Sequence, residues 1–324
     1  MFHLFKKHGL IEDLRAIDMA FHLTSKDQTT PISQGEDPST STAQSSVTCM
    51  YQAHIGGHWR TVTSVWTKNI VNHSLTIYVD SKEPNHRQNC RIDLAPWHFW
   101  GKKSCKTFEV DGLQIDVYWD LRSAKFSGSP EPCSDFYVAL VCDEQVVLLM
   151  GDLKKKVYKR TKSQPCVADA LLFFKKEHAL GKNRFTTKVK FDKHRKDNDV
   201  VVESSTLGPN DHEMCISVDG VVLIHVTNLQ WKFRGNQTIL VNKQPIEVFW
   251  DVHAWLFLNP GSSYGLFIFK PGQANLKNCK NNDSQDETDE TEENDDKSTS
   301  KDQSSCSSSN TSQCSLFLYA WKIE

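Results

Sequence analysis

The chain lacks the features by which several large protein classes are recognised. No segment approaches the roughly 20 consecutive apolar residues that a membrane-spanning helix needs. Charged residues interrupt the first 23 positions, so these do not form the apolar stretch of a secretion signal. The ten cysteines include no C-x-x-C pair, which is a common spacing of zinc ligands. We therefore expect reduced thiols, no metal site, and an intracellular protein of the cytoplasm, the nucleus or both that is not secreted.

The sequence also lacks the short motifs that carry catalysis. It contains no G-x-S-x-G nucleophile turn, no phosphate-binding glycine loop and no H-E-x-x-H zinc motif. His54 and His58 have a spacing that could hold a metal ion on a helix, but they flank a Gly-Gly turn, where the two rings need not converge. The sequence therefore predicts no catalytic residues and no cofactor, and an enzyme is the third choice.

Length and composition indicate about two domains with polar segments attached. The chain has 324 residues, and a domain takes roughly 150. The polar residues concentrate in 1–45, which we expect to be a flexible N-terminal segment, and in 273–313, which we expect to be an acidic, Ser-rich disordered loop. A short amphipathic helix is expected at 10–23, and its mixed charges favour a loosely docked terminus over a membrane-surface or partner helix. Its apolar stripe consists of Leu10, Ile11, Leu14, Ile17 and Phe21.

Between these segments the hydrophobic pattern is typical of β-strands, because apolar and polar residues alternate and turn residues separate the runs. The strands expected in the first half are 47–54, 59–66, 74–80, 90–94, 107–110, 113–121, 136–142 and 146–151. Those expected in the second half are 185–191, 199–204, 214–218, 221–226, 238–241, 246–252 and 264–269. A helix is predicted between the halves at 166–180, with Pro165 near its start and Gly181 at its end.

One hairpin pattern occurs twice. Residues 241–252 align with 110–121, so that Val-Tyr-Trp-Asp in the first half corresponds to Val-Phe-Trp-Asp in the second. Two shorter blocks, 72–80 with 211–219 and 97–101 with 231–235, occur in the same order. Collinear matches of this kind indicate an internal duplication. We therefore predict an all-β protein of two internally duplicated antiparallel β-meanders joined by a single helix, either as two barrels or as one continuous sandwich.

The duplication also sets the expected domain boundaries. The first β-repeat is predicted at 46–152, a basic connector with the helix at 153–183, and the second β-repeat at 184–272 plus 314–324. In the first half, the strand at 136–142 is followed directly by a partner strand, whereas the strand at 264–269 is not. The apolar segment 315–321 is therefore expected to complete the second sheet from the other side of the long loop.

The same blocks resemble a known plant family, the one described as "domain of unknown function 868". The residues that carry the resemblance are 45–49, 72–75, 96–100, 117–126, 159–162, 202–205, 229–236, 248–252 and 318–322. The resemblance covers roughly residues 45–272 and the final ten. It implies a plant source, an uncharacterised protein, and no established activity, substrate or catalytic residues.

Aromatic and charged residues near the repeated hairpin supply candidate binding residues. A Trp-lined barrel interior could hold a small apolar ligand, and the tryptophans expected there are Trp97, Trp119, Trp231 and Trp250. Asp120 and Asp251 follow a tryptophan in both copies, for which a structural role is favoured over paired catalytic carboxylates. Arg122 and Lys125 follow the first copy alone and are candidate ligand contacts.

Charge is segregated along the chain although the net charge is only −2. Residues 154–196 hold fifteen Lys and Arg against three acids, and residues 283–302 hold ten acids against two lysines. Such a basic stretch attracts anionic partners. The residues expected to contact one are Lys154, Lys155, Lys156, Lys159, Arg160, Lys188, Lys190, Lys193, Arg195 and Lys196.

These observations favour a non-enzymatic binding or adaptor protein. Its basic connector would meet a protein, an anionic lipid or a nucleic acid, and the acidic loop would shield the connector. A β-barrel carrier of a small apolar ligand is the alternative, and the sequence does not specify an oligomeric state.

Overall fold

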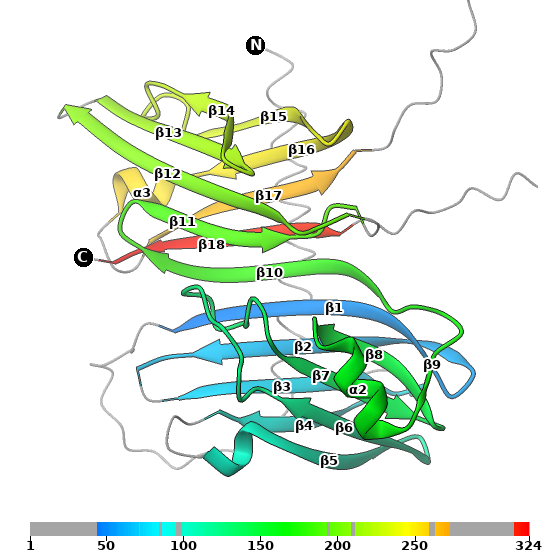
Figure 1. Ribbon diagram of the computed structural model, residues 1–324. Helices are drawn as coiled ribbons and strands as arrows, with labels where there is room; N and C mark the ends of the chain where they lie inside the picture. Colours follow the sequence, from blue (N-terminus) through cyan, green and yellow to red (C-terminus); the bar gives the residue numbers. More distant parts are fainter. Residues whose placement is uncertain are drawn as a thin grey trace, which may run out of the picture.

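Figure 1 shows the protein as a computed structural model. The structure describes residues 44–323 with the exception of 71, 84–85, 95–98, 193–194, 209–210, 259–262 and 273–313. The predictions for the N-terminal helix at 10–23 and for the acidic loop at 273–313 thus lie outside the described residues. Within the described part the protein is all-β, as the sequence predicts.

A single nine-stranded sheet runs through both halves of the chain. Its order is β15-β16-β17-β18-β10-β1-β2-β3-β4. The first half contributes β1 (Ser45–Ile55), β2 (His58–Lys68), β3 (His73–Asp80) and β4 (Arg87–Asp93). The second half contributes β10 (Leu171–Gly181), β15 (Arg234–Val241), β16 (Gln244–Asp251), β17 (Tyr264–Pro271) and β18 (Ser315–Lys322). β18 pairs antiparallel with β17 across the long loop, which is the pairing expected for the C-terminal segment.

Two smaller sheets pack on this large sheet. The first contains β5 (Lys103–Val110), β6 (Leu113–Asp120), β7 (Tyr137–Cys142), β8 (Gln145–Gly151) and the two-residue β9 (Gln164–Pro165). The second contains β11 (Arg184–Val189), β12 (Asn198–Gly208), β13 (Asp211–Val218) and β14 (Val221–Val226). A 3-10 turn, η1 (Phe99–Lys102), precedes β5.

Strand register shows that both smaller sheets lie on the same face of the large sheet. Cys49 of β1 pairs with Lys175 of β10, which pairs with Leu316 of β18. Side chains of paired residues point to one face. Cys49 belongs to the core under the first small sheet and Leu316 to the core under the second. The protein is therefore neither two separate barrels nor one uniform sandwich, because one continuous sheet backs two side-by-side packing units.

The predicted helix at 166–180 is wrong, because most of that segment forms strand β10. β10 lies in the middle of the large sheet, antiparallel to β1 and parallel to β18. Hydrogen bonding to neighbours on both sides outweighs the helix propensity of its Ala, Leu, Lys and Glu residues. The described helices lie elsewhere, at α2 (Lys154–Thr161) and α3 (His253–Phe257).

The repeated hairpins, β5–β6 and β15–β16, are built alike. Both turn through two residues with positive φ, Asp111-Gly112 and Asn242-Lys243. The indole Nε1 of Trp119 donates to the carbonyl of Gly101 at 2.7 Å, and that of Trp250 donates to the carbonyl of Lys232 at 3.1 Å. These equivalent bonds make the two hairpins alike, and the internal duplication itself stays a prediction.

The two halves differ on the outer face of the large sheet, opposite both smaller sheets. In the first half this face carries partly exposed polar side chains such as Thr48, Thr63 and Thr76. In the second half it carries an apolar cluster that we name the outer apolar face, formed by Phe174, Phe249, Leu266, Ile268, Phe317 and Tyr319. All six are buried, with at most 7% of each residue exposed.

Candidate functional site

A groove of about 1340 Å³ separates the two packing units. Its floor is formed by β1 and β10, which lie at the middle of the large sheet (Figure 1). One wall contains β8, β9 and the start of α2, and the other contains β11 and β12. We name this space the inter-unit groove. It arises because the two small sheets sit on one face of a common sheet without joining each other.

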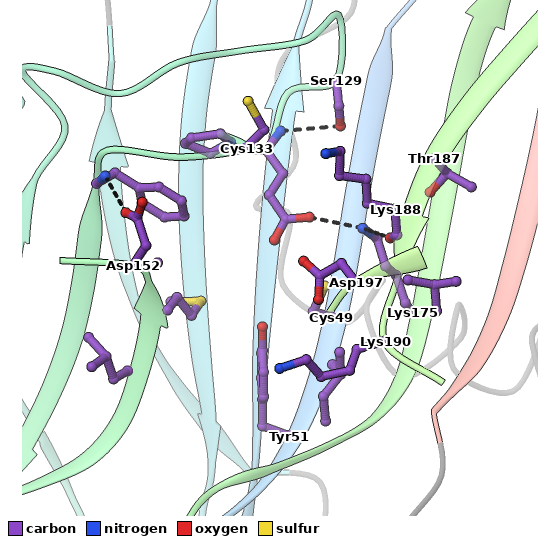
Figure 2. Close-up of a pocket in the computed structure, with 18 of the residues that line it drawn as sticks. Cys49, Tyr51, Ser129, Cys133, Asp152, Lys175, Thr187, Lys188, Lys190 and Asp197 are labelled. Carbon is purple, nitrogen blue, oxygen red and sulfur yellow. Dashed lines mark hydrogen bonds and ion pairs between the residues drawn. The ribbon is translucent and has the colours of Figure 1, made fainter. Parts of the chain in front are cut away.

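Lys175 is the centre of a buried polar network at the groove floor. Its Nζ donates to Glu131 Oε2 at 3.0 Å and to the carbonyl oxygen of Lys188 at 2.7 Å. Glu177 lies 3.9 Å away and accepts hydrogen bonds from Ser129 and Thr187. Figure 2 marks the hydrogen bonds of Lys175 with dashed lines.

This network ties the two units together. Ser129 and Glu131 belong to the β6–β7 loop (residues 121–136) of the first unit, whereas Thr187 and Lys188 belong to β11 of the second. Burying charged groups is costly unless they are paired. The pairing of Lys175 with residues from both sides therefore fixes how the walls of the groove stand relative to its floor.

The network also sets the protonation states on the floor. Burial by itself lowers the pKa of Lys175, but the carboxylates of Glu131 and Glu177 outweigh it and hold that pKa above its usual range. Burial raises the pKa of Glu177, and Lys175 offsets part of this shift. The raised pKa favours the cationic form of Lys175, which is the wrong form for a nucleophilic amine.

Two further floor residues, Cys49 and Tyr51, are kept neutral. Burial, followed by the charge of Glu131, raises the pKa of the Cys49 thiol well above its usual value. Burial, followed by Cys49, raises the pKa of Tyr51. A thiol that remains protonated is a poor nucleophile. The floor therefore provides hydrogen-bonding groups, but neither Cys49 nor Lys175 is activated as a nucleophile.

Lysines reach into the groove from both walls. Figure 2 shows Lys188 of β11 and Lys190, which follows this strand, with Asp197 between them in this view. Lys188 forms an ion pair with Asp199 at 3.4 Å, whereas Lys190 makes no ion pair within the described residues. Lys154, at the start of α2, lines the opposite wall and likewise has no described carboxylate partner.

The lining of the groove carries five Lys and Arg side chains against seven carboxyl groups, and the basic excess lies at its rim. Among the described lining residues, Asp169 and Asp197 make no ion pair and so balance Lys154 and Lys190. Lys155, Lys156 and Lys159 extend the positive charge along the exposed side of α2. Lysines in the first turn of a helix are disfavoured by the helix dipole, so the positive charge at this end of α2 works against helix stability.

The structure thus brings together two parts of the basic stretch at 154–196. Lys154, Lys188 and Lys190 line the same groove, although Lys154 and Lys188 are far apart in the sequence. The rest of the predicted set is not in the groove. Arg160 donates to the carbonyl of Trp119 and to the Tyr137 hydroxyl, both at 3.0 Å, and Arg195 pairs with Asp192. Lys196 is exposed, and Lys193 lies outside the described residues.

Arg122 and Lys125, the candidate ligand contacts, are engaged within their own loop. Arg122 forms a two-pronged ion pair with Asp120, at 2.9 and 2.8 Å. Lys125 pairs with Asp135 at 2.8 Å. Neither lines the groove.

The predicted Trp-lined interior is wrong in part. Trp119 and Trp250 are buried, but in two different cores. Trp231 is 82% exposed, because it lies in a turn between β14 and β15 rather than on a strand. Trp97 lies outside the described residues. The two buried indoles bond to backbone carbonyls and do not share a cavity.

Asp120 and Asp251 have structural partners. Asp120 is buried and pairs with Arg122 and Lys103, and Asp251 pairs with Arg234 at 3.1 Å. Each carboxylate also accepts a hydrogen bond from the backbone N–H of the residue two positions later in the chain. Asp120 accepts from Arg122, and Asp251 accepts from His253. The carboxylates lie at equivalent places in the two halves and close the chain after each hairpin.

The residues that sequence reasoning missed are Glu131, Lys175 and Glu177. Lys175 and Glu177 were assigned to a helix, where two residues apart point in different directions. On a strand the same spacing places both on one face. The available signal for a strand was that Lys175 and Glu177, two oppositely charged residues, stand two positions apart within a largely apolar segment.

Two general features of the described residues bear on the site. No group of three or more His, Cys, Asp or Glu residues in this part of the chain could hold a metal ion. None of the helices described is long and apolar enough to cross a membrane.

Comparison with known proteins gives one match. A family model described as "Plant protein of unknown function (DUF868)" matches residues 42–322. No curated protein and no solved structure is significantly similar to the chain.

Proposed function

This chain belongs to a plant protein family of unknown function, and we propose that it is a non-enzymatic adaptor that binds an acidic partner protein at the inter-unit groove. One observation carries the proposal. Lys154 at the start of α2 and Lys190, the residue after β11, line opposite walls of the groove, and neither has a carboxylate partner among the described residues. An unpaired surface cation costs little until a partner supplies the anion, and charge complementarity then gives both rate and specificity.

The shape of the site favours a polypeptide over a membrane or a duplex. The lysines at the walls are recessed around a floor that contains Tyr51 and Lys175, so a flat lipid surface would reach only the rim. A nucleic acid carries a negative charge at every phosphate and so could not avoid the carboxylates of Asp197, Asp199 and Glu203 on the same wall. A peptide can place acidic side chains beside the lysines and neutral side chains beside the carboxylates of the groove.

An adaptor is favoured over an enzyme by the protonation states on the floor. Lys175 is held as a cation and Cys49 as a thiol. Neither form suits nucleophilic catalysis near neutral pH. The apolar-carrier alternative receives no support, because no tryptophan among the described residues lines the groove.

The acidic stretch at 273–313 enters this proposal through its charge alone. Its ten acids at 283–302 belong to the same chain as the basic connector, so they compete with an acidic partner at a high effective concentration. Deleting 277–313 should then raise partner affinity, most at low salt. Equal affinities of the full chain and the deletion across a salt titration would contradict this part of the proposal.

The test is binding of a labelled decapeptide of alternating Glu and Val, followed by fluorescence anisotropy. The variant carries Lys154→Glu, Lys188→Glu and Lys190→Glu, and we expect its affinity to fall by about tenfold or more. The matched control carries Lys68→Glu, Lys82→Glu and Lys232→Glu, which change three exposed lysines outside the groove and should leave affinity within about twofold.

Anionic vesicles and heparin serve as competing probes. The proposal is supported if the groove variant loses peptide binding and the control variant keeps it. An equal loss in both variants, or binding confined to vesicles or heparin, overturns it.

A further inference from the structure

Strand β8 presents an open edge to the inter-unit groove. On one side it pairs with β7 along its length, but on the other it meets β9 only at Gln145 and Val146. Val147, Leu148, Leu149 and Met150 have no strand partner on that side among the described residues, and all four line the groove.

The direction of the free backbone groups follows from the ladder. Asp152 N–H donates to the carbonyl of Phe136, which makes 136 and 152 a hydrogen-bonded pair. Such pairs alternate in an antiparallel ladder, so Ala139 and Leu149 form a non-bonded pair. The N–H and C=O of Leu149 therefore point away from β7, toward the groove.

The two facing edges have opposite character. β8 reads Gln-Val-Val-Leu-Leu-Met-Gly and carries no charge or proline to discourage pairing. β11, the edge of the other small sheet, alternates buried side chains with exposed Arg184, Thr186 and Lys188. Proteins usually protect an apolar edge strand, and charged residues are a common means. The charged edge is blocked by its own side chains, whereas the apolar edge is left able to pair.

We infer that the acidic partner binds as an extended segment that adds a strand to the free edge of β8. This rests on the proposed function and specifies how the partner is held. Backbone hydrogen bonds to Leu149 supply affinity, while the side chains of the added strand alternate between the floor of the groove and the outward side of the small sheet. A segment with acidic residues at every second position presents them on the outward side, where the exposed side chain of Lys188 also lies, and the residues between them face the floor.

Hydrogen exchange of the full chain tests this directly. With the Glu-Val decapeptide bound, the amide of Leu149 should exchange at least about tenfold more slowly, because it donates to the added strand. Amides of Val241 and Gln244 in the distant hairpin should not change. Lack of protection at Leu149 under saturating peptide would overturn the inference.

A proline variant provides the second measurement. Leu149→Pro removes the outward N–H without removing a bond to β7, and affinity should fall about tenfold. The matched control is Thr238→Pro on β15, whose N–H also lies on a free sheet edge, far from the groove. If Leu149→Pro does not fold, hydrogen exchange of the unmodified chain decides.

Failure here and failure of the proposed function give different results. Peptide binding that depends on the groove lysines but leaves Leu149 unprotected rejects strand addition and keeps the adaptor. Peptide binding that does not depend on the lysines rejects both.

A separate observation concerns the outer apolar face. Its six side chains are buried although both small sheets pack on the opposite side of the large sheet. The cluster spans β16, β17, β18 and β10, or about 14 Å between the outermost of four strands. Forty-three residues precede the first described one, and β1 starts beside this face.

We further propose that residues 10–23 cover the outer apolar face as an amphipathic helix. Fourteen residues of helix span about 21 Å, which suffices to cross the four strands. The stripe that includes Leu10, Leu14 and Ile17 would supply the apolar contact, and the mixed charges would face solvent.

The test compares Leu14→Asp with Ile17→Asp against Glu12→Gln with Arg15→Gln in the full chain. The stripe variant should expose β17 and β18, which would raise binding of an apolar dye severalfold and speed exchange of Phe267 and Leu318 amides. The control should do neither. No change in the stripe variant overturns the proposal. A dimer whose dissociation alone exposes the face also overturns it, and identifies a second copy of the chain as the cover.

Discussion

The two halves of this protein share one hairpin but differ in the segment that comes after it. After β6 the first half has the long β6–β7 loop, which reaches across to Lys175 through Glu131. After β16 the described residues of the second half form the short helix α3, whose Trp255 donates to the carbonyl of Ala320 within its own unit. The shared hairpins stabilise each unit separately. The unshared loop joins the units and shapes the groove between them.

The same contrast applies to the walls of the groove. The first half contributes an apolar strand edge and a lysine-rich helix. The second contributes the edge strand β11, in which exposed polar and basic residues alternate with buried ones. A symmetric duplication would have put like against like. The departures from symmetry are therefore where binding is expected.

The largest effect should come from removing either buried indole. Trp119→Ala and Trp250→Ala should each cost about 3–5 kcal/mol of unfolding free energy, since each leaves a cavity and an unpaired carbonyl. Similar losses would support the equivalence of the hairpins. Trp231→Ala is the control and should cost less than about 0.5 kcal/mol, because Trp231 is exposed. Urea denaturation measures all three, and a control as damaging as the others would contradict the assignment.

Breaking the joint between the units should cost slightly less. Lys175→Met leaves two carboxylates, Glu131 and Glu177, without their buried cation, and we expect a loss of about 3 kcal/mol. Lys188→Met removes only a half-exposed ion pair with Asp199 and should cost below about 1 kcal/mol. Thermal unfolding distinguishes the two, and equal effects would argue against a joint at Lys175.

A smaller effect should expose an asymmetry inside the shared hairpin. Gly235 pairs with Trp250 where Ser104 pairs with Trp119. A Cβ at Gly235 would lie 2.3 Å from the Trp250 ring, so Gly235→Ser should cost about 2 kcal/mol through overpacking. Ser104→Ala should cost under about 0.5 kcal/mol. Free energies of unfolding measured in urea would refute this if Gly235→Ser were neutral.

The smallest effect is a pH dependence. The folded-state pKa of Glu177 is raised by burial, so the folded protein holds this proton more tightly than the unfolded chain does. Stability from this group is present below the unfolded pKa, about 4.3, and falls as pH rises through the folded pKa. Relative to Glu177→Gln, the unmodified protein should lose stability over that window. A constant difference between their unfolding free energies at pH 4 and pH 7 would contradict the shift.

Much of the fold could be predicted from local pattern. Alternation located the strands of the repeated hairpin, and the Asp-Gly and Asn-Lys pairs located its turns, because both signals act within a few residues. The missing partner of β17 could be placed at 315–321 because an apolar strand must be paired and buried. The prediction for 166–180 was wrong because Leu, Lys, Glu and Ala favour a helix locally, whereas the neighbours β1 and β18 come from the two ends of the chain.

The candidate site was predicted only in fragments. The sequence located the lysines at 154 and 188–190, but their approach to one groove depends on how two sheets stack on a third. The interior role predicted for Trp231 was wrong, since its apolar ring gave no sign that it lies in a turn.

The sequence by itself determined the all-β class, the repeated hairpin and the separation of charge, because strand alternation, turn chemistry and composition are local properties. The tertiary structure decided that one sheet backs both halves, that Lys175 joins them, and that an apolar edge faces a charged one across a groove. Those relations depend on pairing between segments more than a hundred residues apart, as when Lys175 of β10 joins Cys49 of β1 to Leu316 of β18. No local pattern encodes such pairing; burial and hydrogen bonding over the whole chain select it.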